Sequence, residues 1–281
     1  MKNSINVSID GKTFDLYNTT SLILISGPCV VENSNLTFNI AKKIKEISQK
    51  LEIPFIFKAS YKKANRTSGI SFRSIGVQNS LEILGNIRAK LNIPVLTDIH
   101  SELEASIAAD FVDVLQIPAF LSRQTELLEA AGETGRIVNI KKGQFLSPED
   151  MRFQIKKVES TGNKKIIVTE RGTSFGYHNL VVDMRSLSIM KKFKYPVIFD
   201  ATHSVQLPSK VNGISGGNPE FIFPMSRAAV SAGVNGIFIE THPNPSKALS
   251  DASSMLKLNK LEPLLKQLIS LHDLVSTYQN S

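Results

Sequence analysis

Eight side chains able to do chemistry lie in or just beyond short apolar runs that recur along the chain. They supply a thiol, two lysines, an arginine, an imidazole, two carboxylic acids and an amide. These residues are Cys29, Lys58, Asp98, Gln116, Lys141, Arg171, His203 and Glu240. If the runs are parallel strands of a closed barrel, their carboxyl ends all meet at one face. The pattern therefore predicts one site built from segments that are far apart in the sequence.

The cations of this set indicate an anionic ligand. Lys58, Lys141 and Arg171 each follow an apolar run, and Lys63 and Arg66 come soon after the first of them. Burying cations at a barrel mouth costs desolvation energy unless an anion pairs with them, and phosphate or carboxylate groups are their usual partners. Any one of these residues can instead be a snorkelling lysine or an arginine paired with an acid. Their convergence favours a phosphorylated or carboxylated small molecule.

A second group has the donor types of a metal site. Cys29, His203, Glu240 and Asp251 offer a thiolate, an imidazole and two carboxylates, a set that suits a divalent transition metal. A lone cysteine is more often a small buried apolar residue, and a lone histidine is more often structural. The four residues have no compact metal-binding spacing, so the residues alone leave both interpretations open.

Asp98 and Gln116 follow two neighbouring runs and carry hydrogen-bonding groups. At a barrel mouth they could bind sugar hydroxyls or an aldehyde. The alternative is that they cap nearby helix ends.

The runs that must position these groups are rich in β-branched and aromatic residues and almost continuously apolar, as expected for strands buried on both faces. Helical periodicity separates them, for example from Leu36 to Leu51, and a barrel of this kind takes about 250 residues. We therefore predict an α/β fold, a single (β/α)8 TIM barrel spanning residues 1–281. The runs are Leu22–Pro28, Pro54–Ser60, Pro94–His100, Val114–Phe120, Ile137–Gly143, Ile166–Gly172, Pro196–His203 and Gly236–His242.

Residues 1–20 differ from the rest. Two alternating segments flank Asp10-Gly11, which predicts a β-hairpin extension that closes the end of the barrel opposite the catalytic face. Two long connections, 61–80 and 204–224, are rich in Ser, Gly and Asn and are predicted to be active-site loops. Ser80 is a candidate N-cap for the helix that follows the first of them.

Composition restricts the partners. The net charge is +8, from 33 Lys+Arg against 25 Asp+Glu. The chain has no tryptophan and no segment in which aromatic and basic residues alternate, so it lacks a surface on which nucleic-acid bases could stack. No apolar run reaches the ~20 residues of a membrane span, and the first residues do not form a secretory signal. One cysteine excludes an intrachain disulfide framework. We expect a cytoplasmic protein with no nucleic-acid or membrane partner.

Six segments resemble the motifs of the 3-deoxy-D-manno-octulosonate 8-phosphate synthase family. They occur in the family's order and at the predicted strand ends, and the likeness extends from about Leu22 to Leu265. The segments are Phe57–Arg66, Leu115–Leu121, Asn139–Phe145, Thr169–Gly172, Phe199–Gln206 and Glu240–Pro243.

The resemblance implies a transferase that condenses phosphoenolpyruvate with arabinose 5-phosphate, an early step toward lipopolysaccharide, on a homotetramer. It places Lys63, Lys141 and Arg171 at phosphoenolpyruvate, with Lys58 beside them. The other implied substrate contacts are Asn65, Arg66 and Thr67 for the pentose phosphate, Asp98 and Gln116 for the pentose chain, and Arg123, which with Phe120 lies at a subunit interface. The implied catalytic residues are Lys58, Lys63, Asp98, Lys141 and His203.

The family has a metal-dependent branch, in which cysteine follows Gly-Pro, and a metal-independent branch with asparagine there. Ser26-Gly27-Pro28-Cys29 carries the cysteine, and Leu249–Ser253 also resembles the metal branch. The resemblance thus implies one divalent ion, iron, zinc, manganese or cobalt, on the four ligands named above. Asn218-Pro219-Glu220 departs from the family, which usually carries arginine near that loop tip.

Two other functions are compatible with parts of this pattern. The related 3-deoxy-D-arabino-heptulosonate 7-phosphate synthases use erythrose 4-phosphate, but they read Lys-Pro-Arg-Thr where this chain has Lys63–Thr67. A non-catalytic anion-binding barrel would bind polyanions with a steep salt dependence and release no phosphate from phosphoenolpyruvate.

Overall fold

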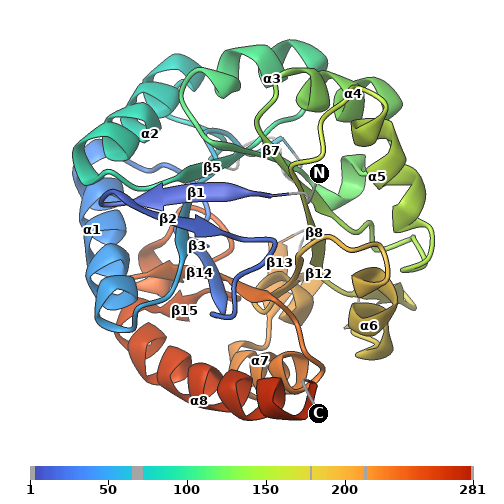
Figure 1. Ribbon diagram of the computed structural model, residues 1–281. Coiled ribbons are helices and arrows are strands. Elements are labelled where there is room, and N and C mark those ends of the chain that lie inside the picture. Colours follow the sequence, from blue (N-terminus) through green and yellow to red (C-terminus); the bar gives the residue numbers. More distant parts are fainter. Residues whose placement is uncertain (1–3, 65–71, 178, 212–213, 280–281) are drawn as a thin grey trace.

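Eight parallel strands pair side by side and close into a barrel, because the seventh strand also pairs with the eighth (Figure 1). The computed structural model describes residues 4–64, 72–177, 179–211 and 214–279. Each strand matches one of the predicted apolar runs. The strands are β3 (Ile23–Gly27), β4 (Phe55–Lys58), β5 (Val95–Asp98), β6 (Val114–Ile117), β7 (Ile137–Lys141), β8 (Ile166–Glu170), β11 (Val197–Asp200) and β14 (Gly236–His242).

A ring of helices surrounds the strands, so the predicted TIM barrel is confirmed. No helix in the described part of the chain has the length and apolar character needed to cross a bilayer. The short strand β15 (Leu256–Lys257) extends the sheet beside β14. The helices are α1 (Ser34–Lys50), α2 (Val77–Leu91), α3 (Glu102–Ala109), α4 (Thr125–Glu133), α5 (Met151–Glu159), α6 (Arg185–Lys191), α7 (Ile222–Ser231) and α8 (Leu261–Gln279).

The interior of the barrel changes from apolar to polar along every strand after the first. One apolar side chain from each of these strands joins a single inner cluster: Ile56, Leu96, Val114, Ile137, Ile167, Ile198 and Phe238. Successive side chains of a strand alternate between faces, so the residue two positions later points the same way. Those residues are Lys58, Asp98, Gln116, Asn139, Thr169, Asp200 and Glu240. The strands therefore place a polar layer directly above an apolar floor.

The N-terminal hairpin, β1 (Asn6–Ile9) and β2 (Lys12–Asp15), lies across one opening of the barrel (Figure 1). Its turn puts Asp10 and Gly11 at φ of 50° and 80°, the left-handed geometry that a two-residue hairpin needs. Val7 packs into the inner apolar cluster with Ile23, at the start of β3. The hairpin thus covers the amino ends of the strands, opposite the polar layer, as predicted.

The connections contain strands that the sequence did not predict, and the predicted cap of α2 was wrong. The 204–224 segment contains an antiparallel pair, β12 (Gln206–Val211) and β13 (Ile214–Gly217), and a second pair, β9 (Thr173–Phe175) with β10 (Asn179–Val181), follows β8. Short strands rich in Ser and Gly lack the apolar alternation that identifies a strand in sequence. Ser80 does not cap α2, because the helix already begins at Val77 with a polar first turn.

Gly27 has no room for a side chain, and we predict that Gly27→Ala is strongly destabilising. An added Cβ would lie 2.0 Å from the main-chain oxygen of Lys58, on the paired strand β4. Both groups are backbone, so β3 and β4 must separate, which we expect to lower the free energy of unfolding by about 3 kcal/mol or more. Urea unfolding measures this value. Gly135→Ala is the control, since nothing lies within 4 Å of its added Cβ and only the φ of +68° opposes it, at about 1 kcal/mol.

Candidate active site

The polar layer contains two ion pairs that are removed from solvent. Lys58 Nζ lies 2.5 Å from Glu240 Oε1, with both side chains only 1% exposed, and Lys141 Nζ lies 2.5 Å from Asp200 Oδ2. Phe238 forms the floor beneath them, with its ring centroid 3.9 Å from Lys141 Nζ. Buried charges of this kind are held by close partners and by the ring face rather than by water.

Arg171 presents an unpartnered donor to the site. Its Nη2 donates to Gln206 Oε1 at 3.1 Å, but its buried Nη1 has no hydrogen-bond partner among the described residues. Burial lowers the pKa of Arg171, against the opposing influence of Asp200 and Glu170. A buried guanidinium with an open donor is a ready site for a carboxylate or phosphate oxygen.

Lys63 and Asp98 form a second charged group in the site. Lys63 Nζ donates to Ser60 Oγ at 2.9 Å and lies 3.9 Å from Asp98 Oδ2. Asp98 also accepts hydrogen bonds from the Ser60 hydroxyl and the Gln116 amide. Burial acts to raise the pKa of Asp98, but Lys58 and Lys63 outweigh it and hold that pKa well below its usual range. Asp98 is therefore an ionised carboxylate.

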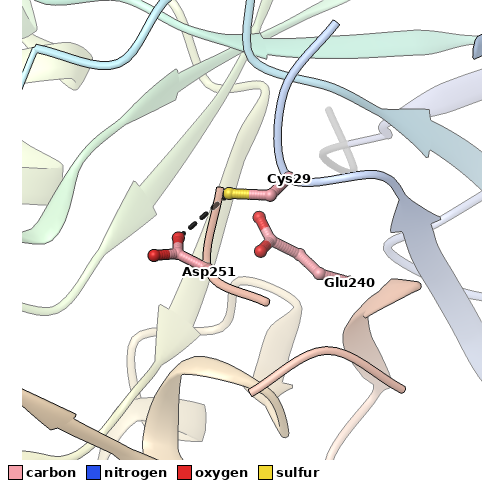
Figure 2. A group of neighbouring side chains, drawn as sticks. All are labelled: Cys29, Glu240 and Asp251. Atoms are coloured by element: carbon pink, nitrogen blue, oxygen red, sulfur yellow. Dashed lines mark hydrogen bonds between the residues drawn. The ribbon is translucent and has the colours of Figure 1, made fainter. Parts of the chain in front are cut away.

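Three of the four predicted metal ligands converge (Figure 2). Cys29 follows β3, Glu240 lies in β14 and Asp251 lies on the segment after it, and their ligand atoms all lie within 4.8 Å of one another. Cys29 Sγ lies 3.0 Å from Asp251 Oδ2. Glu240 Oε2 is buried and has no hydrogen-bond partner among the described residues. A thiol and two carboxylates, one of them with a buried oxygen that accepts no hydrogen bond, fit a divalent transition metal.

The electrostatics of this cluster also fit a cation. Burial raises the pKa of Cys29 well above its ordinary value, and the Asp251 and Glu240 carboxylates raise it further. The pKa of Glu240 is about 2, because His203, Lys58 and Lys63 outweigh the effect of burial. The thiol therefore stays protonated beside two carboxylates unless a positive ion joins them, and a metal would bind it as the thiolate.

His203, the fourth predicted ligand, lies beside the three but outside their group. Its Nε2 is 3.5 Å from Glu240 Oε2, while its Nδ1 is 2.7 Å from Asp200 Oδ2. A carboxylate on one ring nitrogen fixes the orientation of the other, as is common for metal-binding histidines. Asp200 had no predicted role, although it ends β11, two residues after the inward-facing Ile198.

The remaining predicted residues are placed as follows. Gln116 lies in the polar layer next to Asp98, and Arg123 is exposed on the turn after β6. Phe120, on the same turn, is 57% exposed. The predicted subunit interface at these two residues remains a prediction. Asn65, Arg66 and Thr67 lie outside the described residues.

Sequence reasoning missed a buried pair at the ends of β7 and β8. Lys142 Nζ lies 3.4 Å from Glu170 Oε1, and both side chains are 1% exposed. The Glu170 carboxylate also accepts the main-chain N–H groups of Arg171 and Gly172 at 2.9 and 2.7 Å, and the Ser186 hydroxyl at 2.7 Å. The pair thus supports the backbone next to Lys141 and Arg171. From the sequence alone Lys142 resembles a surface lysine, because no neighbouring residue in the sequence indicates that it pairs with Glu170.

Lys142→Met is expected to lower the free energy of unfolding by about 3 kcal/mol, since it leaves the Glu170 charge buried without its cation. The N–H groups that still bond to Glu170 keep this loss near the lower end for a broken buried pair. Adding Glu170→Gln should restore part of the stability, because no buried charge then remains. Denaturant unfolding of both single variants and the double variant tests this, and simple additivity would contradict it.

A parallel barrel with buried cations, an open guanidinium and a thiol–carboxylate cluster at its carboxyl face defines a TIM-barrel enzyme for anionic substrates. The model of the DAHP synthetase I family matches residues 14–277, so the chain belongs to that family. Proteins named 2-dehydro-3-deoxyphosphooctonate aldolase are similar over nearly their whole length. Those of Methylibium petroleiphilum, Koribacter versatilis and Geotalea uraniireducens are 52, 53 and 54% identical, over 92, 91 and 90% of this chain and 93, 92 and 93% of their own. That name is a synonym of 3-deoxy-D-manno-octulosonate 8-phosphate synthase, so the family expected from the motifs is confirmed.

Proposed function

We propose that this protein condenses phosphoenolpyruvate with D-arabinose 5-phosphate and water to give 3-deoxy-D-manno-octulosonate 8-phosphate and inorganic phosphate. The observation that carries the proposal is the identity of 52 to 54% to 2-dehydro-3-deoxyphosphooctonate aldolases along nine tenths of the chain. The buried cations at the barrel mouth support it, because both substrates are anions.

Phosphoenolpyruvate carries a carboxylate and a phosphate on three carbons and needs several fixed cations. We assign Lys58, Lys63, Lys141 and Arg171 to it, with the open Nη1 of Arg171 as one donor. Asp98 and Gln116 are assigned to the pentose chain. The pentose phosphate falls to Asn65, Arg66 and Thr67, and Arg123 is assigned to a neighbouring subunit's site in a homotetramer.

The reaction is mainly a problem of positioning. The enol C3 of phosphoenolpyruvate attacks the pentose aldehyde, water adds at C2, and phosphate leaves as its C–O bond breaks. Holding the two substrates in line can supply about 7–11 kcal/mol of the barrier. Lys141, held by Asp200 and the Phe238 ring, keeps a positive charge fixed where negative charge develops.

We also propose that Cys29, His203, Glu240 and Asp251 hold one divalent ion, iron, zinc, manganese or cobalt, as in the metal-dependent branch. The buried Glu240 Oε2, which accepts no hydrogen bond among the described residues, and the contact between Cys29 and Asp251 support this assignment. Such an ion would orient the aldehyde or help deliver water to C2. Asp200 would orient His203 toward it.

The test compares arabinose 5-phosphate with erythrose 4-phosphate as partners for phosphoenolpyruvate, with chelated protein and single metals added back. Octulosonate 8-phosphate from the five-carbon sugar supports the proposal. Heptulosonate 7-phosphate from the four-carbon sugar would make the chain a 3-deoxy-D-arabino-heptulosonate 7-phosphate synthase, the activity after which the DAHP synthetase I family is named. No phosphate release with either sugar would leave only an anion-binding barrel.

A further inference from the structure

A chain of hydrogen bonds crosses the inside of the barrel, with one side chain from each of four adjacent strands. The Thr169 hydroxyl donates to Asn139 Oδ1 at 2.7 Å, and Asn139 Nδ2 donates to Gln116 Oε1 at 2.8 Å. Gln116 Nε2 then donates to Asp98 Oδ1. Thr169 and Asn139 are completely buried, and Gln116 is 2% exposed. Neither Thr169 nor Asn139 has a role in the function proposed above.

The chain of hydrogen bonds runs in one donor-to-acceptor direction, which the Asp98 carboxylate determines. An ionised carboxylate only accepts hydrogen bonds, whereas an amide has one donating and one accepting end. Gln116 must therefore turn its NH2 toward Asp98 and its oxygen toward Asn139. Asn139 must then donate to Gln116 and accept from Thr169. With any amide reversed, two acceptors would face each other in a buried site, which is costly.

The other oxygen of Asp98 joins this chain to the cation side of the site. Asp98 Oδ2 accepts from the Ser60 hydroxyl, whose oxygen in turn accepts from Lys63 Nζ at 2.9 Å. Lys58 and Lys63 supply the positive charges that lower the pKa of Asp98. Among the described residues Gln116 Nε2 donates only to Asp98, which leaves its second hydrogen for a ligand. Thr169 and Asn139, which hold the Gln116 amide and through it the Asp98 carboxylate, are not themselves assigned to either substrate.

We propose that Asn139 and Thr169 are positioning residues that hold the Gln116 amide and the Asp98 carboxylate in the orientation that receives the pentose. This inference rests on the proposed function, which places the pentose at these two groups. Of the cations assigned to phosphoenolpyruvate, Lys141 and Arg171 are held by Asp200 and Gln206, outside these hydrogen bonds. Lys63 lies near Oδ2 of Asp98, the oxygen that Gln116 does not bond. Disturbing the chain should therefore weaken binding of the pentose more than binding of phosphoenolpyruvate.

Thr169→Val removes the hydroxyl with little change of shape, and Thr169→Ser keeps it. We expect the valine variant to raise the KM for arabinose 5-phosphate about tenfold, as for one lost buried hydrogen bond, and to leave the KM for phosphoenolpyruvate within about twofold. The serine variant should match the wild type. Thr37→Val is the matched control, because it removes another buried hydroxyl, one that donates to the main-chain oxygen of Asn33 at the start of α1. It should change neither KM.

Asn139→Asp tests the direction of the chain. Aspartate cannot donate to Gln116, so the amide must turn away from Asp98, and we expect a loss of about 100-fold in kcat/KM for the pentose. If this variant fails to fold, the two Thr169 variants decide. Equal increases in both KM values, or a serine variant as impaired as the valine variant, would overturn the inference. A wild-type protein that makes no product from arabinose 5-phosphate would instead overturn the proposed function.

Discussion

Replacing Cys29 with alanine is expected to abolish metal binding and to lower turnover at least about 100-fold, more than the loss of an outer-shell partner causes. Cys29 is the only cysteine in the chain, so no other thiol can replace it. Its Sγ lies 3.0 Å from Asp251 Oδ2, so its removal takes one of three converging ligands. Elemental analysis of purified protein and a steady-state assay after metal is added back measure both losses.

Cys29→Asn is the informative companion variant. The metal-independent branch carries asparagine at this position, so we expect this variant to retain some activity that chelation does not remove. Thermal unfolding checks that both variants fold. Full activity of Cys29→Ala after chelation would show that the thiol–carboxylate cluster does not serve a metal in this reaction.

Arg171→Ala is expected to lower kcat/KM for phosphoenolpyruvate about 100-fold or more, because a buried charged donor to an anion is lost. Its buried Nη1 has no hydrogen-bond partner among the described residues, and its Nη2 already donates to Gln206. Arg171→Lys keeps the charge but loses the planar fork, so an intermediate value is expected. Steady-state kinetics with each substrate varied in turn measures the effect.

Arg185→Ala is the matched control for Arg171, because Arg185 is an exposed arginine paired with Asp183 at the start of α6. It should leave kcat/KM for both substrates within about twofold of the wild type, as for most surface changes. If Arg171→Ala impaired arabinose 5-phosphate as strongly as phosphoenolpyruvate, the assignment of this arginine to the phosphoenolpyruvate side would be wrong.

Much of the barrel could be predicted because its signals are local. A run of β-branched residues identifies a strand wherever it lies, and Asp10-Gly11 identifies a hairpin turn through its left-handed backbone. Alternation of side chains also determines which residues share a face, so Lys58 must point with Ile56, and Glu240 with Phe238. The types of chemistry at the strand ends followed from these patterns alone.

The partners of these groups were decided by the tertiary structure. Nothing near Lys142 in the sequence indicates Glu170, and nothing near Asn139 indicates both Gln116 and Thr169, because those contacts depend on strand register and on closure of the barrel. Register determines which buried donor meets which acceptor, and a shift of one residue would turn every side chain to the other face. By itself the sequence therefore determined the barrel and the chemical groups at its mouth. Only the folded chain decided which of them pair, because a charge or an amide is oriented by neighbours that the local pattern does not contain.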